Sequence, residues 1–158
     1  MANDVLNFSR GKYAYYGNSA LGLNPANSRL VIVVLEAAEA DADLANHNDL
    51  AALLAEEGNT EATSTGYARK EHASAGVTWS KDDTGNTAKV VIDENDTWTS
   101  VSQADSESWV KLLVCYDADN EAGTDADIIV LSQHDFAVTP NGGDITAEYS
   151  ADGVWASS

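Results

Sequence analysis

The apolar run RLVIVVLE, from Arg29 to Glu36, is the feature that most constrains the fold of this 158-residue chain. Its residues from Leu30 to Leu35 are all apolar and mostly β-branched, and it follows the turn-forming sequence NPANS. A strand with apolar side chains on both faces has to be covered on both sides. The run therefore predicts a central, buried strand in a layered domain.

The sequence after Thr60 has further strand patterns and turn signals. A stripe of Leu50, Leu53 and Leu54 at helical spacing predicts one short helix near residues 46–57, capped by Asn46 or Asn48. The expected strands are a hairpin at 77–80 and 89–93, single strands in SWVKLLVCYD and DIIVL, a second hairpin over HDFAVTPNGGDITAEY, and the short edge strand GVWAS. We predict a mainly β (α+β) fold, an antiparallel sandwich or barrel with an extended N-terminal arm.

The expected organisation is one domain preceded by an arm. Residues 1–28 show no persistent helical or strand period, so we expect an extended N-terminal arm anchored by tyrosines. Residues 29–158 are expected to form a single β-rich domain. No apolar run reaches the roughly 20 residues that span a bilayer, and the first residues do not resemble a signal peptide.

The charge of the chain excludes some partners. There are 26 acidic and 8 basic residues, which gives a formal net charge of −18. Such a surface repels nucleic acid and anionic lipid, so neither is an expected partner. At about 1 M salt the screening length falls to roughly 3 Å, and the carboxylates no longer repel one another. The acid excess therefore indicates a protein adapted to high salt; the alternative is an acidic protein kept soluble at ordinary salt.

The acidic stretch that begins at Asp117 imitates a calcium-binding loop. Asp117, Asp119 and Glu121 place oxygen ligands at alternate positions, as such a loop does. The match then fails, because glycine stands at the seventh position (Gly123) and the twelfth is Ile128 instead of glutamate. We expect a solvated turn, with weak surface binding of Ca²⁺ or Mg²⁺ as the alternative, and no other cofactor.

The sequence does not favour an enzyme. Its three histidines, His47, His72 and His134, are scattered, and Cys115 lies in the apolar run LLVCYD, where a thiol is usually buried and inert. A Cys115–His134 pair for nucleophilic catalysis is the minor alternative. The four tryptophans are expected to fill the core, with a carbohydrate-binding platform as the alternative. These are Trp79, Trp98, Trp109 and Trp155.

Several blocks of the sequence, in their order and spacing, resemble a family of small virion proteins of tailed viruses, encoded near the major capsid protein. The segment ADGVWASS is less apolar than the end of the relatives, and the acid excess is heavier. The second departure suggests a virus of a halophilic archaeon, or else a marine phage. The blocks are NPANSRLVIVVLE, DADLANHNDLAALLA, TGYARK, DTWTSV and the stretch from Lys111 to Trp155.

The resemblance implies a non-enzymatic capsid decoration (cement) protein. Such proteins bind the major capsid protein on the outer surface of the head, often as homotrimers, after synthesis in the host cytoplasm. We expect the arm to contact the neighbouring subunit, by strand addition, through five residues. They are Arg10, Lys12, Tyr13, Tyr15 and Tyr16.

Three other functions stay open. The first is a different virion component: a turret, a tail tube or a head–tail connector. The second is a receptor-binding or glycan-binding spike module, which requires Trp98 and Trp155 to be exposed. The third is a small hydrolase that uses Cys115.

Overall fold

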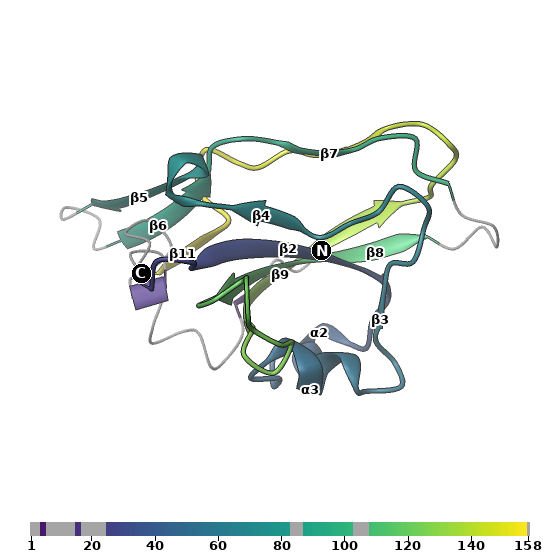
Figure 1. Cartoon of the computed structure of the whole chain (residues 1–158), viewed down its shortest axis with the longest axis horizontal. Coiled ribbons are helices and arrows are strands. Elements are labelled where there is room, and N and C mark those ends of the chain that lie inside the picture. Colours follow the sequence, from purple (N-terminus) through teal and green to yellow (C-terminus); the bar gives the residue numbers. More distant parts are fainter. Residues whose placement is uncertain (1–3, 6–14, 17–24, 83–86, 103–107, 158) are drawn as a thin grey trace.

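The computed structural model of the chain describes residues 4–5, 15–16, 25–82, 87–102 and 108–157 (Figure 1). In these ranges no helix is long and apolar enough to cross a membrane. The helices are α2 (Asp41–Leu44), α3 (Leu50–Leu54) and the 3-10 helix η1 (Ser74–Gly76). The strands are β1 (Asp4–Val5), β2 (Arg29–Ala37), β3 (Thr60–Glu61), β4 (Lys70–His72), β5 (Val77–Asp82), β6 (Thr87–Ile92), β7 (Asp96–Trp98), β8 (Trp109–Asp117), β9 (Ile129–Val138), β10 (Ile145–Ala147) and β11 (Trp155–Ser157).

A six-stranded antiparallel sheet organises the domain. Its strand order is β1-β9-β8-β2-β3, with β4 also paired to β2 beside β3. All six residues from Leu30 to Leu35 are buried, and β8 lies along one edge of β2 while β3 and β4 share the other. The prediction that Arg29–Glu36 is a central buried strand is confirmed.

The two faces of β2 build two separate cores. Val31, Val33 and Leu35 pack with α2 and α3, which lie together on one side of the large sheet (Figure 1). Leu30 and Ile32 point the other way, into a larger core shared with β5, β6, β7 and β10. These four strands belong to two small sheets, β11-β6-β5 and β10-β7. The predicted mainly β fold with antiparallel sheets is therefore confirmed, and it has three layers because a doubly apolar strand needs cover on both sides.

The second predicted hairpin is wrong. Residues 129–138 form one strand, β9, which pairs with β8, and the expected return strand β10 pairs with β7 instead. Ile145 lies opposite Trp98 in that pairing, and both side chains are buried in the larger core. The first predicted hairpin, β5 with β6, and the edge strand β11 are confirmed.

The expected single helix near residues 46–57 is also wrong in detail. α3 lies within that range but is shorter, α2 precedes it, and the cap of α3 is Asp49 instead of Asn46 or Asn48. The Asp49 carboxylate accepts a bond from the Ala52 amide at 2.8 Å. The first two amides of α3 donate to the acidic loop: Leu50 to the Ile128 carbonyl at 2.9 Å, and Ala51 to a second carbonyl of that loop at 3.0 Å. The helix starts at Leu50 because its capping partners lie there.

Candidate functional site

The start of the chain contacts the domain in both of its described parts. Tyr16 is buried, and its ring centroid lies 5.0 Å from that of Tyr116. Tyr15 is 63% exposed, and it is the one exposed large hydrophobic side chain in the described ranges. The other three predicted arm residues, Arg10, Lys12 and Tyr13, lie outside those ranges. Tyr15 is therefore the predicted contact residue that the structure places at the surface, whereas Tyr16 is part of the chain's own core.

The acidic loop between β8 and β9 is held by hydrogen bonds within the chain. The Asp117 carboxylate accepts a bond from the Asp119 amide at 3.0 Å, and the Asp119 carboxylate accepts one from the Asn27 side chain at 3.2 Å. The Glu121 carboxylate accepts a second bond from that Asn27 amide, also at 3.2 Å. A Cβ atom on Gly123 would lie 2.7 Å from the Asp119 carbonyl oxygen, so the turn requires glycine. The loop is thus a compact, ordered turn.

The same three acids were the predicted weak cation site. Asp117 is buried, whereas Asp119 and Glu121 are exposed, so the three carboxylates do not share one environment. Within the part of the chain that the structure describes, no group of three or more His, Cys, Asp or Glu side chains is arranged to hold a metal ion. Binding of Ca²⁺ or Mg²⁺ at this loop stays a prediction.

Arg69 ties the acidic loop to β3. Its guanidinium donates to Asp125 at 2.6 and 3.0 Å, and to Glu61 at 2.8 and 2.6 Å. Two bidentate pairs on one guanidinium use most of its donors. These hydrogen bonds hold the pKa of Asp125 below its usual range. One half-buried cation thereby fixes the loop between β8 and β9 against the opposite edge of the large sheet.

Tyr67 extends this network to the backbone of β2. Its hydroxyl donates to Glu61 at 2.9 Å and accepts a bond from the Val34 amide at 3.1 Å. Val34 lies between the parts of β2 that pair with β4 and with β3, so the hydroxyl serves a strand amide there. Burial, followed by the charge of Glu61, raises the pKa of Tyr67. The neutral phenol is therefore a structural donor.

A buried acid joins the two layers of the larger core. One oxygen of Asp96, in β7, accepts the Tyr149 hydroxyl at 2.6 Å and lies 3.0 Å from Nε2 of His72, in β4. His72 and Asp96 are both buried. Burial and the bond to Asp96 raise the pKa of Tyr149. These contacts hold the β7–β10 pair over the large sheet.

His134 and Asp135 point to opposite faces of β9, as their adjacency in a strand predicts. His134 lies 3.0 Å from the Ser132 hydroxyl, while Asp135 pairs with Lys111, which also pairs with Asp41 at 2.5 Å on the helix side. Burial, followed by the charge of Lys111, lowers the pKa of His134.

The lowered pKa of His134 predicts a pH effect on stability. The folded protein favours the neutral ring, so the stability is complete above the unfolded value of about 6.5 and falls as the pH drops below it. We expect urea denaturation to show a smaller loss of stability between pH 7 and pH 5 for His134→Gln than for the wild type. Equal losses in the two proteins would contradict this assignment.

Cys115 is fully buried in the core beneath α3, as expected for an inert thiol. Burial raises its pKa, so the reactive thiolate is disfavoured. We expect the folded protein to resist N-ethylmaleimide and to take up one equivalent after unfolding in guanidinium chloride. Rapid labelling of the folded protein would contradict the structure and would favour the hydrolase alternative.

The tryptophans fill the core where their side chains are described. Trp98 and Trp109 are 1% and 0% exposed and meet edge to face, with ring centroids 5.3 Å apart. Trp79 is partly buried against the same core, and the side chain of Trp155 lies outside the described residues. The prediction that the tryptophans fill the core is confirmed for Trp98 and Trp109. The glycan-binding alternative requires an exposed Trp98, and the structure contradicts this requirement.

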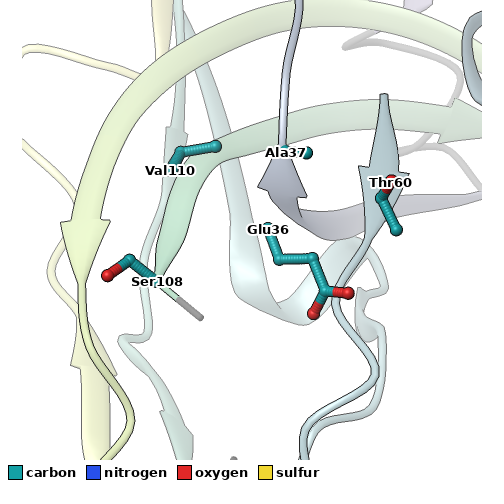
Figure 2. Close-up of a pocket in the computed structure, with 5 residues that line it drawn as sticks. All are labelled: Glu36, Ala37, Thr60, Ser108 and Val110. Atoms are coloured by element: carbon teal, nitrogen blue, oxygen red, sulfur yellow. The ribbon is translucent and has the colours of Figure 1, made fainter. Parts of the chain in front are cut away.

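A hollow lies at one end of the large sheet, next to Ser108 and Val110 (Figure 2). Its volume is about 250 Å³, and its lining is Glu36, Ala37, Thr60, Ser108 and Val110. The Glu36 carboxylate already accepts bonds from the amide and hydroxyl of Thr63, at 3.1 and 3.4 Å. Of the predicted site residues that the structure describes, none lines this hollow.

The long-range hydrogen bonds and ion pairs of the structure were not predicted from the sequence. Arg69 and Asp125 are 56 residues apart, and Asp96 and Tyr149 are 53 apart. No local motif marks such pairs, because their proximity depends on strand pairing.

Compared with family models, curated proteins and solved structures, the chain has no match.

Proposed function

We propose that this chain is a capsid decoration protein that binds the outer surface of the major capsid protein lattice of a tailed virus and stabilises the head. The proposal rests first on the resemblance of its sequence blocks to small virion proteins. The acid excess suits a surface in concentrated salt, where screening removes the repulsion between carboxylates. The expected assembly is a homotrimer.

The roles of the polar residues support a structural protein. Arg69 holds two carboxylates, the buried Asp96 holds two layers together, and Cys115 is enclosed in a core. Each of these chemically capable groups is engaged in keeping the layers in place. A rigid domain with such ties can bridge capsid subunits with little loss of conformational entropy on binding.

The observation that carries the proposal is the contrast between Tyr15 and Tyr16. Tyr16 is 3% exposed and anchors the start of the chain to Tyr116, while the adjacent Tyr15 is 63% exposed. An exposed aromatic ring on an anchored backbone is well suited to an interface, because it buries a large area with few rotamers to fix. Tyr15 and the basic residues Arg10 and Lys12 are the proposed capsid contacts.

The test is co-sedimentation of the purified chain with capsids of the virus that encodes it, from which this protein has been stripped. We expect Tyr15→Ala to weaken binding at least tenfold, and Tyr15→Phe, the matched control that keeps the ring, to bind nearly as the wild type does. Unchanged binding by Tyr15→Ala, Arg10→Ala and Lys12→Ala together would overturn the proposed contact.

A further inference from the structure

The described residues before Pro25 contact the domain at two small sites. The first is β1, which pairs antiparallel with β9 in a register that places Asp4 opposite Gln133 and Val5 opposite Ser132. This pairing involves two residues of a strand that runs from Ile129 to Val138. β1 is an edge strand of the large sheet.

The second contact is a socket for an aromatic ring. Tyr16 packs on Tyr116, and Tyr116 itself belongs to β8, next to β9 in the sheet. Burial raises the pKa of Tyr16, and the neighbouring Tyr15 raises it further. The edge of β9 and the face of Tyr116 are two receptor positions on the domain, and both are filled by residues from before β2.

We propose that these two contacts are exchanged between copies of this chain. β1 and Tyr16 of one copy then occupy the β9 edge and the Tyr116 socket of the next copy. Such an exchange preserves these two contacts and makes them intermolecular, while the other contacts stay within each copy. Repeated around an axis it closes into a ring of copies.

The topology permits the exchange. Apart from β1, every strand of the three sheets lies between Arg29 and Ser157, so the sheets keep their other pairings when β1 leaves. The chain from Tyr16 to Asn27, which stays bonded to the acidic loop of its own domain, would reach about 38 Å if fully stretched, and this is enough to cross to a neighbouring domain of this size.

Charge favours a second copy as the occupant. Residues 1–28 contain one acid, Asp4, and two bases, Arg10 and Lys12, for a net charge of +1. The whole chain has a net charge of −18, so the residues after 28 carry a net charge of −19. A mildly basic segment laid between two strongly acidic domains reduces the repulsion that otherwise opposes their approach.

The proposal goes beyond the decoration function and does not depend on it, because the test uses the isolated chain without capsids. Two single variants are co-expressed and oxidised: Val5→Cys in one chain and Ser132→Cys in the other. Residues directly opposite in an antiparallel pair have Cα atoms about 4.5–5.5 Å apart, within the range of a disulfide. Cys115 is fully buried and does not compete.

The exchange predicts a disulfide-linked dimer of the two variants on a non-reducing gel. Val5→Cys with Thr97→Cys, a control at an exposed position of β7, should give no linked product. The double variant, Val5→Cys with Ser132→Cys in one chain, should likewise link different copies. An intramolecular disulfide in that variant, with no link between the single variants, overturns the proposal. So does the absence of any link in all combinations, because the β1–β9 register would then be wrong.

Discussion

Trp109→Ala should lower the free energy of unfolding by about 4 kcal/mol, the usual cost of deleting a fully buried tryptophan. Trp109 is 0% exposed, and its ring meets those of Trp98 and Tyr67 edge to face, at 5.3 and 5.6 Å. Its indole N–H also donates to the buried Ser64 hydroxyl at 3.0 Å, which the variant leaves without this donor. Urea denaturation at constant salt measures the change.

The matched control for this prediction is Trp79→Ala. Trp79 packs against the same core but is only partly buried, so its removal should cost about 1–2 kcal/mol. Equal losses for the two variants would contradict the layered core, because they would place both rings in the same environment.

Arg69→Met should lower the free energy of unfolding by about 2 kcal/mol. The change leaves the carboxylates of Glu61 and Asp125 partly buried without their cation, and removal of one partner of a buried pair is costly. The expected loss of stability is smaller than for a fully buried ion pair, because the Arg69 side chain is 28% exposed. Arg69→Lys should recover only part of the loss, since an ammonium cannot form two bidentate pairs.

The effect of Arg69 should also depend on pH. The folded pKa of Asp125 is lowered, so its stabilising contribution is present above the ordinary carboxyl pKa of about 4 and is lost as the pH falls through that range. The stability difference between Arg69→Met and the wild type should therefore shrink below about pH 4. Lys89→Met, which removes an exposed cation bonded to the Ala151 carbonyl, is the control and should change stability by less than about 0.5 kcal/mol. A pH-independent difference would contradict the ion-pair account.

Strands were predicted correctly where their own residues show which faces are buried, or where the partner strand follows directly in the sequence. β2 is apolar on both faces and is buried on both faces, and β5 and β6 are neighbours in the sequence that pair antiparallel with each other. β9 and β10 were mispaired because the turn sequence TPNGG indicates a change of direction without specifying a partner. Ile145 pairs opposite Trp98 because both side chains enter the same core, which depends on the tertiary fold.

The candidate site was predictable in composition but less so in geometry. The tyrosines near the start of the chain were recognised from the sequence, yet the separation of the exposed Tyr15 from the buried Tyr16 depends on Tyr116, far along the chain. The acids of the loop were equally visible. Their partners, Asn27 and Arg69, were not, because these contacts join residues 92 and 56 positions apart.

The location of this chain in purified virus particles, determined by cryo-electron microscopy, tests the central claim most directly. If the chain is a decoration protein, we expect density for the three-layered domain on the outer shell, at three-fold or quasi-three-fold positions. Tyr15 should then lie against a neighbouring subunit. Density confined to a vertex or to the tail would make the chain a turret or connector component. Its absence from the particle would contradict the proposed function altogether.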